Sequence, residues 1–325
     1  NRGTEEIGPV FALTQVSANG LLGWQEKIGL LTGAATELDE YRGAGAFVDA
    51  PLPRIEETRA MLMGFRSYSN PTETGTDLDE EYLRDRLSLR VTRQLESATE
   101  LHWSVYGGLE LEDLEIEDEL GKFRDDQLRI ASLGTRVGWR SGANTQSNVT
   151  VDLLQGLDAL GASLRADDLA VDERDVDFTL LKLQFTRQLR FYERWSVRLD
   201  SFGQYARDVL PDSQRFKIGG DRLGRGFEVA EIAGDRGVGA KLELRRDLFA
   251  DLPVLGRTSA YTFYDFGAAW KENAPGRESA TTAGVGASMS GEHLTGYLEI
   301  ATPITGVDIE GSDQASVFAE LSYRF

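Results

Sequence analysis

The stretch that decides the fold is Arg86–Thr92, RLSLRVT, in which apolar and polar residues alternate strictly. Successive side chains of a β-strand point to opposite faces, so Leu87, Leu89 and Val91 share one face. The other face carries only polar or charged residues: Arg86, Ser88, Arg90 and Thr92. A helix would instead need apolar residues at spacings of three and four. The stretch therefore predicts a strand with one apolar and one strongly polar face.

The same alternation recurs along the chain, at 181–186, 197–200, 240–245 and 316–325. A strand that crosses a membrane needs about 9–11 residues that alternate apolar-out and polar-in. A soluble sandwich is the alternative, since its strands alternate too, but they average only about 5–6 residues. The longer runs, with charge on the second face, favour an all-β, antiparallel transmembrane β-barrel that occupies residues 1–325 as one domain.

Fifteen strands are predicted by this pattern, and they span nearly the whole chain: 6–17, 24–33, 41–51, 58–69, 84–95, 100–111, 128–141, 147–156, 177–189, 195–207, 237–247, 257–270, 280–290, 293–303 and 316–325. Bacterial barrels have an even number of strands. Asn1, Arg2 and Gly3 are therefore expected to end a first strand that lies mostly upstream, which makes sixteen strands. Asn1 also looks like a cut point, because no signal peptide opens the chain.

The predicted connections alternate between two lengths. Short turns are expected near 18–23, 52–57, 96–99, 142–146, 190–194 and 291–292. Long loops are expected near 70–83, 112–127, 157–176 and 208–236. Short periplasmic turns and long external loops are typical of outer-membrane barrels. The prediction is thus a bacterial outer-membrane protein with both barrel termini on the periplasmic side.

The composition limits the classes of molecule that can be partners of this protein. The net charge is −19, which makes nucleic acid an unsuitable partner because phosphate binding needs a concentrated basic surface. The acidic residues gather in the predicted long loops, where they serve either as solvated surface or as ligands for divalent cations. Their spacing matches no EF-hand loop, so solvation is the favoured interpretation.

Catalysis is not indicated. The chain has no cysteine, and its two histidines, His102 and His293, are far apart in the sequence and lack a metal-ligand spacing. There is no GxSxG nucleophile elbow. We expect no catalytic, metal-binding or cofactor-binding residue.

The predicted loop near 208–236 contains a candidate anchor. Arg225 carries a planar fork of five donors. By strand parity, Glu243 and Asp265 both point into the barrel, where they can accept charge-assisted bonds from a guanidinium group. The pair Gly219-Gly220 and Gly226 permit positive φ and close backbone approach. The alternative is a glycine-rich turn on the surface.

These residues also carry a family resemblance. Phe216, Gly219, Gly220, then Arg225-Gly226-Phe227, Gly234-Asp235 and Glu243 are similar in order to the long inward-folded sixth loop of the BamA/FhaC barrel superfamily. Downstream, Phe263-Tyr264-Asp265-Phe266-Gly267 and Trp270 resemble its aromatic-Asp-Gly strand motif. The resemblance implies that Phe227 and Gly267 belong to the anchor as well.

Within the superfamily, RGFEVAEIAGDRGVGAKLELR at 225–245 most resembles the FhaC/ShlB/HecB haemolysin secretion and activation proteins of two-partner secretion. NRGTEEIG at the start and NGLLG at 19–23 resemble the opening strands of that branch. One residue departs from the family pattern, because Gly224 stands where Val or Ile usually precedes the arginine. The departure concerns the packing of the loop tip, and not the arginine itself.

The resemblance implies a function. POTRA domains would precede Asn1 and capture a secreted exoprotein, which the barrel would pass through the outer membrane as an unfolded polypeptide. Lipid, lipopolysaccharide and the barrel assembly machinery are the other partners it implies, with the barrel working as a monomer. The alternatives are a BamA/TamA-like insertase and a passive porin, which should lack the Arg225 motif and its carboxylates.

The end of the chain carries a second candidate site. Leu321, Tyr323 and Phe325 lie at a spacing of two and share the face expected to contact lipid. The pattern resembles the C-terminal signal by which outer-membrane barrels are recognised for assembly.

Overall fold

The computed structural model describes residues 11–36, 40–70, 80–118, 121–166, 174–252, 255–305 and 315–324. The described chain is almost entirely β-structure, with one short 3-10 helix, η2 (Asp212–Gln214). The strands are β1 (Phe11–Asn19), β2 (Lys27–Ala35), β3 (Tyr41–Pro51), β4 (Thr58–Ser69), β5 (Glu81–Ser97), β6 (Leu101–Asp118), β7 (Gly121–Ser141), β8 (Thr145–Gly156), β9 (Ser163–Ala166), β10 (Thr179–Tyr192), β11 (Trp195–Ala206), β12 (Phe216–Ile218), β13 (Ile232–Gly234), β14 (Arg236–Leu252), β15 (Gly256–Trp270), β16 (Glu278–Ser290), β17 (Leu294–Thr305) and β18 (Ser316–Tyr323).

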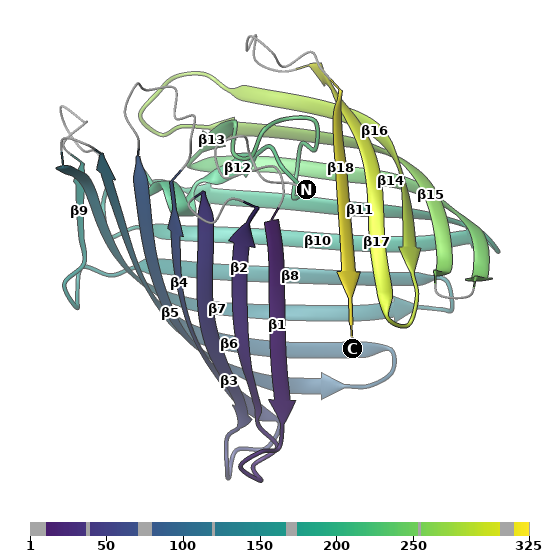
Figure 1. Ribbon diagram of the computed structural model, residues 1–325, viewed down its shortest axis with the longest axis horizontal. Helices are drawn as coiled ribbons and strands as arrows, with labels where there is room; N and C mark the ends of the chain where they lie inside the picture. Colours follow the sequence, from purple (N-terminus) through teal and green to yellow (C-terminus); the bar gives the residue numbers. More distant parts are fainter. Residues whose placement is uncertain are drawn as a thin grey trace.

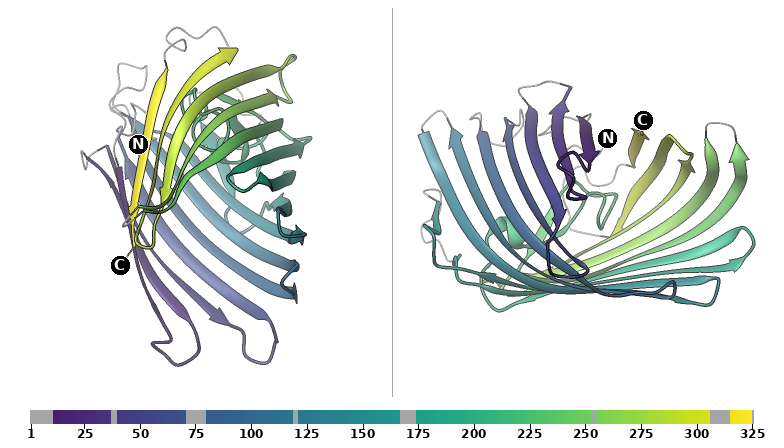
Figure 2. Two further views of the ribbon diagram at one scale, coloured as in Figure 1. Left: turned by 90° about the vertical axis from the view of Figure 1, so that its right-hand side faces the viewer. Right: turned by 90° about the horizontal axis from the view of Figure 1, so that it is seen from below.

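One antiparallel sheet of sixteen strands forms the molecule, which confirms the predicted architecture. Fifteen strands pair in chain order from β1 to β18, and β9 pairs with β7 off this path. Figures 1 and 2 show the sheet curved so that β1 and β18 come to the same side, opposite β8 and β10. Strands at the front cross those at the back steeply, as expected for barrel strands tilted by about 35–45°.

All fifteen predicted strands are present in the sheet. The expected end of a further strand at Asn1–Gly3 lies outside the described residues. In the part of the chain that is described, no helix is long and apolar enough to cross a membrane.

The alternation in the sequence sorts side chains between two faces. Leu87, Leu89 and Val91 lie on the outer face and are 45%, 46% and 37% exposed. Cross-strand pairing extends this apolar surface, because Leu89 pairs with Leu62 on β4 and with Leu109 on β6. The partner face of the same strands carries the polar residues, so the barrel is apolar outside and polar within.

Two predicted loops differ from the structure: 157–176 contains the short strand β9, which pairs with β7, and the larger difference is at 112–127. The acidic stretch 112–127 was expected to be a long loop, but β6 continues to Asp118 and β7 starts at Gly121. The reason is that the alternation persists through the charges: Glu112, Leu114 and Ile116 share the inner face and are buried. Charge alone does not end a strand whose partner strand continues to pair with it.

The connection between β11 and β14, residues 207–235, folds back into the barrel and is called the lumen loop below. It contains η2, β12 and β13, which lie inside the curve of the sheet (Figure 1). Its apolar side chains pack against Phe202, Ala269 and Ala280 of the inner wall, and together they form one buried cluster with the loop residues Phe216, Ile218, Leu223, Phe227 and Ile232. A loop that buries this much apolar surface is part of the folded barrel.

Candidate functional site: an arginine that anchors the lumen loop

Arg225, at the tip of the lumen loop, makes a bidentate ion pair with Asp265 on β15. Its Nε lies 3.0 Å from Asp265 Oδ2, and its Nη2 lies 2.8 Å from Oδ1. The backbone N–H of Arg225 also donates to Oδ2, at 3.3 Å. Both side chains are almost completely buried, at 2% and 0% exposed. Two parallel hydrogen bonds between a guanidinium group and a carboxylate are strengthened by the opposite charges, and they also fix the orientation of both groups.

The remaining nitrogen of the guanidinium group serves two further carboxylates. Nη1 donates to Glu243 Oε1 on β14 at 2.8 Å and to Glu299 Oε1 on β17 at 2.9 Å. The Tyr261 hydroxyl donates to the same Glu299 oxygen at 2.8 Å. The guanidinium carbon lies 3.5 Å from the centroid of the Phe263 ring, within the range of a cation–π contact. One side chain thus joins the loop to three strands.

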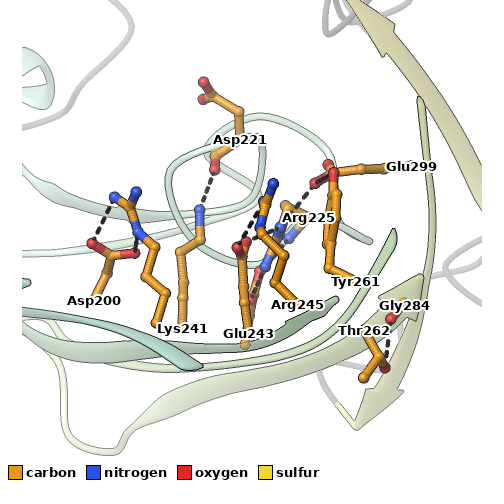
Figure 3. Close-up of polar contacts among 12 residues, drawn as sticks. Asp200, Asp221, Arg225, Lys241, Glu243, Arg245, Tyr261, Thr262, Gly284 and Glu299 are labelled. Atoms are coloured by element: carbon orange, nitrogen blue, oxygen red, sulfur yellow. Dashed lines mark hydrogen bonds and ion pairs between the residues drawn. The ribbon is translucent and has the colours of Figure 1, made fainter. Parts of the chain in front are cut away.

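A second cation, Arg245, limits the excess of negative charge in this cluster. Its Nη2 lies 3.4 Å from Glu243 Oε2, and its Nη1 donates to Ser288 Oγ at 2.7 Å. Figure 3 shows Arg225 and Arg245 together beside Glu243, between it and the side chains of Tyr261 and Glu299. Lys241, which pairs in register with Asp265, is a third cation close to the cluster, but Arg225 alone among them contacts all three carboxylates.

The structure brings the anchor residues expected from the sequence together. Phe227 is 4% exposed within the apolar cluster, and Gly219 and Gly220 adopt positive φ values of 116° and 84°. A side chain at Gly226 would come within 2.9 Å of the Pro303 nitrogen, and one at Gly267 within 2.8 Å of Ile218 Cδ1. Since Arg225 is buried, the alternative of a glycine-rich surface turn does not hold.

Sequence reasoning missed Glu299 and Tyr261, and it named Phe263 only as part of the strand motif, without its contact with Arg225. Glu299 lies between Leu298 and Ile300, which are both exposed on the outer face. A single carboxylate in an alternating strand has inward parity, and that signal was available. The contact of Glu299 with Arg225 could not be predicted in the same way, because it depends on the register of four strands.

The departure from the family pattern at Gly224 has a structural consequence. Gly224 has a φ of 83°, and a side chain there would approach Ile218 Cγ2 to 2.9 Å. Leu223, one residue earlier, is 1% exposed and packs in the apolar cluster. In this chain the apolar contact beneath the tip is therefore made by Leu223, and glycine provides the turn.

The base of the lumen loop is attached at a second place. Asp212 forms ion pairs with Arg124 on β7 and with Arg215. Burial alone would raise the pKa of the Asp212 carboxyl, but these two guanidinium groups outweigh it and hold the pKa below its ordinary value. Asp235, 0% exposed, accepts hydrogen bonds from the backbone N–H groups of Leu210 and Glu272, at 2.8 and 2.7 Å. Both ends of the loop are thus fixed next to each other.

Comparison with known proteins now decides the family. A model of the haemolysin secretion/activation proteins ShlB/FhaC/HecB matches residues 1–291. The chain belongs to this family. It is therefore an outer-membrane β-barrel of the two-partner secretion type, and the apolar outer face of the sheet contacts lipid. The family expected from the motif around Arg225 is confirmed.

Solved structures show the same fold. CdiB from Escherichia coli is similar with a TM-score of 0.86 and 18% identity, over 99% of this chain and 61% of that one. CdiB from Acinetobacter baumannii gives 0.74 and 17%, over 96% and 56%. BamA from Haemophilus ducreyi lacking POTRA domains 1-3 gives 0.66 and 13%, over 96% and 67%. The chain thus spans about three fifths of the CdiB chains. A comparison with curated proteins gave no match.

The second candidate site is described only in part. Leu321 and Tyr323 lie on the outer face of β18, at 67% and 62% exposed, among the lipid-facing residues of this family member. Phe325 lies outside the described residues. Among the described residues, no cluster of three or more His, Cys, Asp or Glu side chains is arranged to hold a metal ion.

Proposed function

We propose that this barrel exports one partner exoprotein across the outer membrane as an unfolded polypeptide. The observation that supports it is the lumen loop, which fills part of the barrel and is held there by a buried polar cluster around Arg225. An ion cluster has two discrete states, paired or broken, and elements that switch between discrete arrangements can gate a passage. A barrel with such a loop can stay closed until a chain engages it.

The rest of the machine follows from the family. POTRA domains upstream of Asn1 would capture the exoprotein in the periplasm and deliver it to the barrel domain, residues 1–325. The periplasm contains no nucleotide to power transport, so folding of the exported protein outside the cell would provide the free energy for export. The barrel would work as a monomer in contact with lipid and lipopolysaccharide, with no catalytic residue, cofactor or nucleic acid involved.

Deletion of this chain from the producing bacterium tests the proposal. We expect one large exoprotein to disappear from the culture medium, while the levels of other outer-membrane barrels stay unchanged, as measured by quantitative mass spectrometry of both fractions. A general fall in outer-membrane barrels would identify an insertase instead. A loss of small-solute uptake alone would identify a porin.

Sidedness gives a separate prediction. The turn at Gly142 lies on the side of the short connections, whereas Glu117 lies near the tip of the β6–β7 hairpin. If the short turns are periplasmic, a cysteine at Glu117, or at Asp172, which lies outside the described residues, should react with an impermeant maleimide on whole cells, and a cysteine at Gly142 should not. The chain has no native cysteine, so the background is clean. The opposite labelling pattern would invert the topology and place both termini outside.

The C-terminal residues give a further prediction, which concerns assembly of the barrel. We expect Leu321, Tyr323 and Phe325 to be read during assembly by strand pairing, in which backbone bonds give affinity and alternate side chains give specificity. Phe325→Leu keeps most of the apolar area, so refolding in detergent should be unchanged while barrel levels in cells fall. If burial in lipid were the role of Phe325, worth about 1.5–3 kcal/mol, the substitution would be nearly silent in both assays. Normal barrel levels in cells after deletion of Phe325 would contradict both mechanisms.

A further inference from the structure

The inner wall of the barrel has two chemically different halves. On β14, β15 and β17, the carboxylates of Glu243, Asp265 and Glu299 face the lumen and are paired with Arg225. On β8 and β10, the lumen face is instead rich in uncharged polar side chains. We call the following five residues the amide wall: Gln146, Asn148, Thr150, Gln184 and Gln188.

Strand register assembles these residues into one surface. Gln146 pairs with Gln188, Asn148 with Thr186, and Thr150 with Gln184. Their face is the lumen face, because Lys182 has the same parity as Gln184 and donates to Gln214 Oε1 of the lumen loop at 3.2 Å. The surface lies between Lys182 and the β10–β11 turn, and so on the side of the short turns.

The amide wall has no partner within the protein. In the described part of the chain, none of its five side chains makes a hydrogen bond to another protein group. Gln146, Gln184 and Gln188 are exposed. Since the lumen loop attaches through Arg225 and Asp212, it leaves this surface open. Amide and hydroxyl groups that can donate and accept are therefore presented to whatever occupies this half of the lumen.

The cross-strand neighbours of the amide wall add positive charge. Arg136 pairs in register with Thr150, and Arg140 pairs with Gln146. Both arginines are exposed, and within the described residues neither forms an ion pair. A cavity of about 330 Å³ opens between them and β5 and β6, and its lining includes Gln94, His102, Ser104 and Asn148, with Glu100 as its one carboxylate. The surface thus combines neutral hydrogen-bonding groups with two free cations.

We infer that the amide wall, with Arg136 and Arg140, is the surface along which the exported polypeptide passes. An extended chain carries an unpaired N–H and C=O at every residue, and side-chain amides can bond to both. Exchanging water for peptide groups changes the free energy by only about 0.5–1.5 kcal/mol per bond, so the chain is held weakly and can slide. The arginines favour acidic side chains. The inference rests on the proposed export function and adds the route that the exported chain takes through the barrel.

Disulfide crosslinking tests the route in the full-length protein, which has no cysteine in this chain. The patch variants are Gln184→Cys and Gln188→Cys. The matched control is Glu320→Cys, a lumen-facing, exposed position on β18, which lies on the opposite side of the barrel (Figures 1 and 2). The probe is an unstructured Gly-Ser peptide of about 20 residues, longer than the ~30 Å membrane core when extended, with one terminal cysteine. It is added from the periplasmic side with an oxidant.

We expect several-fold more mixed disulfide at Gln184→Cys and Gln188→Cys than at Glu320→Cys. A probe with Asp at every fifth position should crosslink more than one with Lys, and Arg136→Gln combined with Arg140→Gln should remove that difference. Equal crosslinking at all three positions, or crosslinking at Glu320→Cys alone, would overturn the inference, as would no crosslinking at any position.

Export measured in parallel separates this inference from the proposed function. Gln184→Leu combined with Gln188→Leu keeps the volume of the wall and removes its hydrogen-bonding groups. We expect a folded barrel that exports more slowly. Normal export by this variant would reject the route and leave the export function standing. Absence of any exoprotein export by the wild-type chain would reject the export function itself.

Discussion

Substitution of Arg225 by alanine is expected to release the lumen loop while the barrel remains folded. The change leaves Glu243, Asp265 and Glu299 close together without the one side chain that pairs with all three. Removal of one partner of a buried ion pair costs about 3–5 kcal/mol, roughly a hundredfold to a few thousandfold in the equilibrium between a held and a released loop. The sheet itself loses no strand pairing. Export should fall strongly, because the proposed gating needs an ordered loop that the exported chain can engage.

Two measurements separate this effect from unfolding. Resistance of the barrel to detergent at room temperature, seen as heat-modifiable gel migration, should be retained, while proteinase K should cut within residues 207–235. Arg222→Ala is the matched control in the same loop, since Arg222 stacks over the Phe202 ring at 5.1 Å and forms no ion pair in the described structure. Arg225→Lys should give an intermediate result, because a lysine cannot reproduce the bidentate fork. Normal protease resistance and normal export in Arg225→Ala would show that the anchor role is wrong.

Deletion of Pro211 to Gly234 is expected to enlarge the single-channel current in planar bilayers and to abolish export. The deletion removes η2, β12 and β13, which lie inside the barrel. The ends to be joined are already adjacent, since the Leu210 N–H donates to Asp235 Oδ1 at 2.8 Å. A barrel of sixteen strands leaves an aqueous channel when nothing fills it, so the open current should rise several-fold.

The Arg225→Ala variant provides the internal comparison for this measurement. Its loop is present but released, so its current should switch between the small wild-type level and the large level of the deletion. An unchanged current after the deletion would place residues 211–234 outside the conducting path. A deletion variant that still exports the exoprotein would show that the loop is not needed for passage, even if it obstructs the channel.

The sequence alone determined the fold of this protein. Alternation with a period of two is a local property of a strand, so runs such as Arg86–Thr92 fix which side chains face lipid and which face the lumen without knowledge of any partner. The same parity, together with the Arg225-Gly226-Phe227 motif, placed Glu243 and Asp265 opposite the arginine. Both carboxylates lie within 3.0 Å of its guanidinium nitrogens in the structure.

The tertiary structure alone decided where strands end and which distant side chains meet. The acidic stretch after Leu111 looked like a loop because its charge suggested solvent, but pairing with β7 continues through Glu112 and Ile116. Glu299 is 74 positions from Arg225 and joins it only through the accumulated register from β14 to β17. The amide wall likewise exists only because β8 and β10 pair residue by residue. Parity is local and can be read from a sequence, whereas register is a relation between strands, and here it assembled both surfaces that face the lumen.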